Sequence, residues 1–96
     1  MPTNTIYNQA TTPGVSVKSS VFSVTAAGNA SIRLKGVPRG GFRATLEFAD
    51  GELVVYQGNV LELSSTSNVA MLVQTGDFRF DVVNPEGDAV QLEVRT

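Results

Sequence analysis

Acidic side chains alternate with an arginine along one strand-like stretch of the chain. Asp77, Arg79 and Asp81 would share one face of a strand, and Glu86 and Asp88 follow in the next loop. Carboxylate oxygens are ligands that calcium prefers, so these acids could form a calcium site. The competing interpretation is a solvated face on which Arg79 lies between two acids. We favour the solvated face, because calcium loops normally gather their oxygens within one compact turn.

The side chains on which most catalytic sites depend are missing from this sequence. Its 96 residues include no histidine and no cysteine. A serine or cysteine nucleophile usually needs a histidine base, and zinc and redox metals usually need histidine or cysteine ligands. No phosphate-binding loop, dinucleotide fingerprint or calcium-loop motif is present. We therefore expect a protein that is not an enzyme and that uses no cofactor.

Basic side chains gather around a glycine-rich loop in the first half of the chain. They are Arg33, Lys35, Arg39 and Arg43. Such a cluster could contact a nucleic-acid backbone, but the net charge is −2 and no nucleic-acid motif is present. Residues 1–46 hold five basic residues and no acid, whereas the rest of the chain holds two basic residues and nine acids. We therefore expect the basic loop to meet an acidic protein surface, for example on another subunit.

The elements that must position these residues are short strands, and the clearest is a hairpin over residues 42–57. Its Asp50-Gly51 pair suits a two-residue type I′ turn, because both central residues of that turn need positive φ. A two-residue turn would pair Phe48 with Leu53, and the apolar faces of both arms would then coincide. This agreement fixes the predicted register of the hairpin.

The same register places Val54 and Tyr56 on the outer face of the hairpin, beside Thr45. Together they would form a half-apolar patch on the surface. A patch of this kind either binds a partner or is covered by the chain's own first residues or by a second sheet. The sequence does not decide between these two interpretations.

The rest of the chain alternates short apolar stretches with turn residues and shows no helical periodicity. A change of phase near Ser19-Ser20 suggests a bulge or a strand that passes between sheets. The nearly continuous apolar run 69–74 is typical of a strand buried on both faces. About eight short strands predict an all-β fold. We expect a small antiparallel β-sandwich, immunoglobulin-like or jelly-roll-like, with a small β-barrel as the alternative.

We expect two parts in the chain: an extended N-terminal arm, residues 1–14, and a single β-sandwich domain, residues 15–96. The arm is polar and contains two prolines, so its larger apolar side chains, Ile6 and Tyr7, would anchor it on a neighbouring subunit. The first residues lack the features of a secretory signal peptide, and no stretch is long and apolar enough to cross a bilayer. We therefore expect no membrane partner.

The Thr/Asn/Gln-rich arm and the short-strand body resemble the small structural proteins of bacteriophage particles. These include capsid decoration (cement) proteins and head–tail or tail accessory proteins. The resemblance implies a virion component, assembled in the host cytoplasm, that stabilises a capsid or tail lattice by binding other virion proteins and copies of itself. Capsid and tail roles both stay open. The alternative is a carbohydrate- or receptor-binding module, although the chain has no tryptophan to form a sugar platform.

Overall fold

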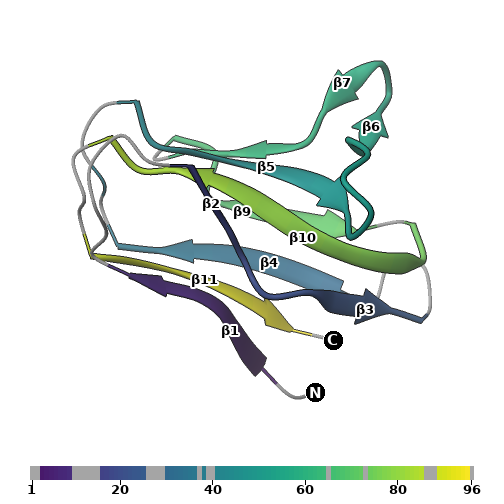
Figure 1. Ribbon diagram of the computed structural model, residues 1–96, viewed down its shortest axis with the longest axis horizontal. Coiled ribbons are helices and arrows are strands. Elements are labelled where there is room, and N and C mark those ends of the chain that lie inside the picture. Colours follow the sequence, from purple (N-terminus) through teal and green to yellow (C-terminus); the bar gives the residue numbers. More distant parts are fainter. Residues whose placement is uncertain are drawn as a thin grey trace.

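The structure, a computed structural model, describes residues 3–9, 16–25, 30–36, 38, 41–64, 66–72, 74–85 and 89–95. These residues form strands joined by turns (Figure 1). The strands are β1 (Thr3–Gln9), β2 (Ser16–Lys18), β3 (Phe22–Val24), β4 (Ala30–Lys35), β5 (Arg43–Phe48), β6 (Val55–Tyr56), β7 (Asn59–Val60), β8 (Glu62–Leu63), β9 (Val69–Leu72), β10 (Gly76–Val83) and β11 (Val90–Arg95).

The longer strands form two antiparallel sheets that face each other (Figure 1). Sheet A has the order β1-β11-β4-β9. Sheet B has the order β2-β10-β5-β8, and β3 also pairs with β10. The short strands β6 and β7 make a separate two-stranded ribbon. The predicted all-β sandwich is therefore confirmed.

Strand pairing follows one rule along the chain. β1 pairs with β11, β2 and β3 pair with β10, β4 pairs with β9, and β5 pairs with β8. The chain thus behaves as one long antiparallel hairpin that is rolled up. Two further pairings, β11 with β4 and β10 with β5, then link successive strand pairs of this rolled hairpin into two sheets. This is the strand order of a jelly roll rather than that of an immunoglobulin domain, so it decides between the two predicted types of sandwich.

The core lies between the two sheets and is filled by the inward-facing side chains of every long strand. Phenylalanine rings dominate the half that sheet B contributes. Phe78 stacks on Phe48 with ring centroids 5.2 Å apart, and Phe22 lies 5.9 Å from Phe78. Sheet A supplies aliphatic side chains, of which Ile32 and Leu92 are fully buried. Burial of this apolar surface is the main stabilising contribution, since no disulfide is possible.

The predicted irregularity near Ser19-Ser20 is a β-bulge. Lys18 lies opposite Asp81 and Phe22 lies opposite Phe78, so the β2–β3 segment has one more residue than the stretch of β10 that it faces. The extra residue changes the phase and turns Phe22 into the core. Ser19 occupies the bulge, where its hydroxyl oxygen accepts a 2.8 Å hydrogen bond from the Phe80 N–H.

The hairpin after β5 has a three-residue turn, so the predicted two-residue type I′ turn is wrong. The Gly51 N–H donates to the Phe48 carbonyl, and the Phe48 N–H donates to the Glu52 carbonyl. In the Asp50-Gly51 pair only Gly51 has positive φ, at 96°, whereas a type I′ turn needs both. A type I turn followed by a glycine with positive φ is the usual three-residue hairpin.

The extra turn residue shifts the register by one, so the inward-facing and outward-facing side chains of the second arm exchange places. Leu53 therefore lies opposite Glu47 and not opposite Phe48. Val54, predicted to face outward, is 1% exposed in the core, whereas Leu53 and Val55, predicted to face inward, are more than half exposed. The two-residue turn with positive φ at both positions occurs instead at Gln57-Gly58, between β6 and β7.

The strand β9 corrects another prediction, because it lies at the edge of sheet A and is not buried on both faces. Leu72 points into the core and is fully buried. Val69 and Met71 alternate with it and are 60% and 58% exposed on the outer side. The continuous apolar run thus reflects one buried face and one apolar outer face.

Candidate functional site

The two residues expected to anchor an arm on a neighbour, Ile6 and Tyr7, are core residues of this chain. Thr3–Gln9 is the edge strand of sheet A, paired along β11. A register shift between Thr5 and Tyr7 marks a bulge there, which explains how two consecutive side chains can both be buried. Residues 3–9 therefore belong to the sandwich, and the rest of the predicted arm lies outside the described residues.

The ribbon of β6 and β7 stands out from sheet B on the side away from sheet A (Figure 1). We count the flanking residues 53, 54 and 61 with the ribbon, although they still pair with β5. Val55 lies directly opposite Val60, so both side chains share one face of the ribbon. Leu53, two residues before Val55, is also more than half exposed. Of the two predicted surface residues here, Val54 is buried and Tyr56 is half-buried against the core. The predicted patch of Val54 and Tyr56 is therefore wrong, and the exposed apolar residues here are Leu53, Val55 and Val60.

The Tyr56 hydroxyl is buried and has no hydrogen-bond partner within the described chain. Burial without a compensating interaction raises the pKa of this hydroxyl above its ordinary value of 10.0. The ring therefore packs against the core at the expense of an unsatisfied polar atom. Such atoms are uncommon in native folds, which marks the ribbon as a functional candidate.

The structure divides the predicted basic cluster between two faces of the sandwich. Arg33 and Lys35 project from β4 on the outer face of sheet A, and both are exposed. Arg43 begins β5 of sheet B, where alternation places it on the outer face of that sheet. Arg39, the fourth member, lies outside the described residues. In the sequence the glycine-rich loop therefore lies between basic residues that face in opposite directions.

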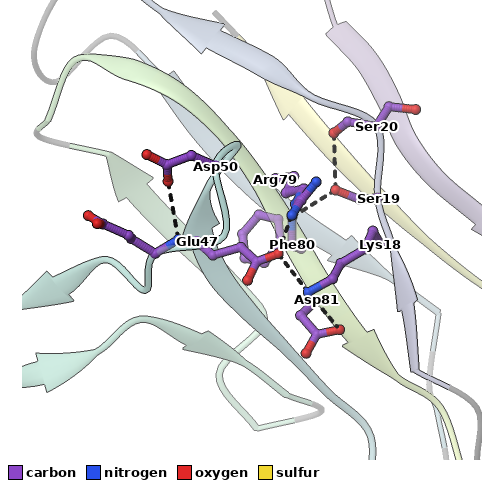
Figure 2. A network of polar contacts seen from close by, with 9 residues as sticks. Lys18, Ser19, Ser20, Glu47, Asp50, Arg79, Phe80 and Asp81 are labelled. Carbon is purple, nitrogen blue, oxygen red and sulfur yellow. Dashed lines mark hydrogen bonds and ion pairs between the residues drawn. The ribbon is translucent and has the colours of Figure 1, made fainter.

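A network of charged residues lies on the outer face of sheet B, with Glu47 at its centre (Figure 2). The Lys18 ammonium and the Arg79 Nε each donate a 2.8 Å hydrogen bond to the Glu47 Oε1. Lys18 also lies 3.7 Å from an oxygen of Asp81. These residues come from β2, β5 and β10, so the network ties three neighbouring strands together.

Glu47 is the residue that the sequence did not mark, because alternation placed it on a solvent-facing side with no sign of its burial. Its side chain is only 5% exposed, whereas those of Arg79 and Lys18 are 26% and 48% exposed. Burial alone would raise the pKa of the Glu47 carboxyl. The hydrogen bonds and charges of Lys18 and Arg79 outweigh this effect and hold the pKa below its ordinary value of 4.5. A carboxylate held this way by two cations is a structural ion pair rather than a base.

The acids considered for calcium are engaged in contacts with neighbouring strands. The Ser23 hydroxyl donates a 2.6 Å hydrogen bond to Asp77, and Asp81 interacts with Lys18. Among the described residues, no three acids lie close enough together to hold a metal ion. Glu86 and Asp88, the remaining candidates, lie outside the described residues.

The outer face of sheet A is hollowed into an open depression of about 360 Å³. The residues around it are Ser31, Ile32, Arg33, Val69, Glu93 and Arg95. Lys35 lies 3.6 Å from Glu93 and partly neutralises it. Arg33 and Arg95 are exposed, and neither forms an ion pair with another described residue. The depression therefore combines two guanidinium groups that have no ion-pair partner among the described residues with the exposed Val69 side chain.

Comparisons with known proteins identify no family for this chain. No family model, no curated protein and no solved structure matches it. Within the described chain, no helix has the length and apolar character that crossing a membrane requires.

Proposed function

We propose that this chain is a non-enzymatic structural protein that assembles with other proteins as a component of a virion. The observation that carries the proposal is the projecting ribbon, residues 53–61. It exposes Leu53, Val55 and Val60 to solvent, at 53%, 54% and 39% of their surfaces. Apolar side chains gathered on a protruding element are a feature of protein interfaces rather than of isolated monomers.

The edge of sheet A supports the same proposal. β9 ends the sheet and exposes Val69 and Met71 on its outer side. Soluble proteins usually protect such edges with charged residues, prolines or bulges, and β9 carries none of these. An unprotected apolar edge favours a protein whose working state is covered by a neighbour.

The virion setting rests on the resemblance to phage structural proteins and on an analogy of fold. Jelly rolls occur in viral capsid domains and also in lectin domains, so the fold alone does not select one function. A carbohydrate-binding module has less support here. Every aromatic ring of the sequence is buried or half-buried, so none is fully presented as a platform for a sugar.

The test of the virion role is co-purification with particles from the source of the sequence. We expect the chain to stay with the particles through a density gradient, in many copies per particle by quantitative mass spectrometry. A chain found only in the soluble fraction would contradict the proposal. A glycan array screened with the purified chain addresses the alternative, and specific hits there would favour the carbohydrate module.

A further inference from the structure

The ribbon and the strand ends at its base carry apolar side chains and only negative charge. Residues 49–64 include Asp50, Glu52 and Glu62 and no basic residue. Glu52 and Glu62 are exposed and form no ion pair with another described residue. They lie next in sequence to the ribbon, with its exposed Leu53, Val55 and Val60. The ribbon is therefore an apolar protrusion with acids at its base.

The depression on sheet A has the opposite character. The outer faces of β4 and β11 carry Arg33, Lys35 and Arg95 against one acid, Glu93, which Lys35 partly neutralises. Val69 forms an apolar wall beside the guanidinium groups of Arg33 and Arg95. The depression is thus an open, apolar-walled hollow with an excess of positive charge.

We propose that the ribbon of one copy docks into the sheet A depression of a second copy. This inference deepens the proposed function by naming the partner as the chain itself, and it rests on that function. In this contact the ribbon of one copy enters the hollow of the other, and its exposed valines pack against Val69. Glu52 and Glu62 of the first copy then lie near Arg33 and Arg95 of the second. Opposite charges steer the encounter and fix its orientation, while apolar burial supplies most of the affinity.

Charge argues for this crossed contact and against the symmetric alternatives. Two ribbons packed together would place Glu52 and Glu62 against the same acids of the other copy. Two sheet A faces packed together would oppose Arg33 and Arg95 in the same way. Like charges brought together across an interface disfavour it, so of these three contacts the ribbon-to-depression contact is the complementary one.

The ribbon stands on the side of sheet B away from sheet A (Figure 1), whereas the depression lies on the outer face of sheet A, so one chain cannot fill its own depression. The contact is heterologous: each copy offers a ribbon to one neighbour and a depression to another. Contacts of this type produce closed rings if the rotation closes and open filaments if it does not. Either product suits a protein that is repeated over a larger assembly.

The experiment uses two blocking variants and their mixture. Val55→Asp places a charge in the ribbon, and Val69→Asp places one in the wall of the depression. Both positions are more than half exposed, so both variants should fold. The matched control is Val21→Asp, at an equally exposed valine outside both surfaces. Circular dichroism and thermal melting check folding, and Arg33→Glu replaces Val69→Asp if that variant does not fold.

Sedimentation velocity over a range of concentrations then measures assembly. We expect wild type and Val21→Asp to associate and each blocking variant to stay monomeric. The equimolar mixture should form one-to-one dimers and nothing larger, because it retains one intact ribbon and one intact depression. Raising salt from roughly 0.01 to 1 M shortens the screening length from about 30 to about 3 Å and should weaken the wild-type contact.

Three results would overturn the inference. The first is a wild-type chain that stays monomeric at every concentration and salt. The second is a mixture that forms no dimer. The third is a Val69→Asp variant that still associates, which would indicate a symmetric ribbon contact. The proposed function fails separately, if the chain does not co-purify with particles. If the chain associates with itself but is absent from particles, the inferred contact holds and the proposed function fails. If the chain is bound to particles but does not form the crossed contact, the proposed function holds and the inference fails.

Discussion

Leu53 lies directly across from Glu47 at the start of the second hairpin arm, one position away from the partner that a two-residue turn would give it. That single step decides which side chains of the arm enter the core. Because side chains alternate along a strand, the step sends Val54 inward and leaves Leu53 and Val55 in solvent. The step therefore also creates the exposed ribbon on which the proposed function rests.

The register predicts that alanine substitution at two neighbouring valines changes the free energy of unfolding by very different amounts. Val54→Ala should lower the free energy of unfolding by about 1.5–3 kcal/mol, because it removes fully buried methyl groups. Val55→Ala should change it by less than about 0.5 kcal/mol, as expected for an exposed position. Urea denaturation of the two variants measures both values. Equal or reversed effects would mean that the arm has the other register.

The sequence could not choose this register, because both phases of the second arm are apolar. Leu53 and Val55 alternate with Val54 and Tyr56, so either set could fill the core. The Asp50-Gly51 pair is also compatible with either turn, since a three-residue turn needs positive φ only at the glycine. Packing against the second sheet decides the outcome, and that information is not local.

The same limit applies to the N-terminal strand and to the residues of the candidate site. Ile6 and Tyr7 are two apolar residues in a polar stretch, and their strand pairs with β11 at the other end of the chain. Glu47 shows no sign in the sequence of the two cations that bury it, because Lys18 and Arg79 come from distant strands. In contrast, the bulge near Ser19 was predictable, since a change of phase within one stretch is a local signal.

The Glu47 ion pairs predict a loss of stability in acid. The folded-state pKa of Glu47 lies below its ordinary value of 4.5, so the unfolded chain takes up this proton first as pH falls. The stabilisation is therefore fully present above pH 4.5 and is lost as pH falls through the lower folded-state pKa. Glu47→Gln keeps the shape but removes the charge. Its deficit relative to wild type should be largest at neutral pH and should shrink below pH 4.5.

Denaturation of wild type and Glu47→Gln across this pH range measures the effect. At neutral pH we expect a deficit of about 1–3 kcal/mol, because the charge is buried but its partners remain partly solvated. Asp77→Asn is the matched control, since the Asp77 side chain is exposed and its carboxylate accepts only a hydroxyl hydrogen bond from Ser23 among the contacts described. A deficit that does not vary with pH would show that the charge of Glu47 contributes nothing.

The hydrogen bonds of the Ser19 hydroxyl predict that removing this hydroxyl destabilises the fold. It accepts a hydrogen bond from the Phe80 N–H and donates one to the Ser20 carbonyl. Ser19→Ala would leave a buried backbone N–H without its partner, which costs about 1–3 kcal/mol. The control is Ser20→Ala, whose side chain is exposed and which should be neutral. Thermal unfolding of both variants measures the difference. If Ser19→Ala is as stable as Ser20→Ala, the Ser19 hydroxyl does not stabilise the fold.

Because the Tyr56 hydroxyl is unsatisfied, we expect that its removal does not destabilise the fold. Tyr56→Phe removes a buried polar atom that has no partner among the described residues, so the isolated chain should be unchanged or more stable by about 1 kcal/mol. The raised pKa adds a test at high pH. The unfolded chain loses this proton first as pH rises through 10.0, so wild type should lose stability there and Tyr56→Phe should lose less. Denaturation at neutral and alkaline pH measures both effects. A clearly destabilised Tyr56→Phe would mean that the hydroxyl has a partner, and weaker self-association without destabilisation would place that partner on the neighbouring copy.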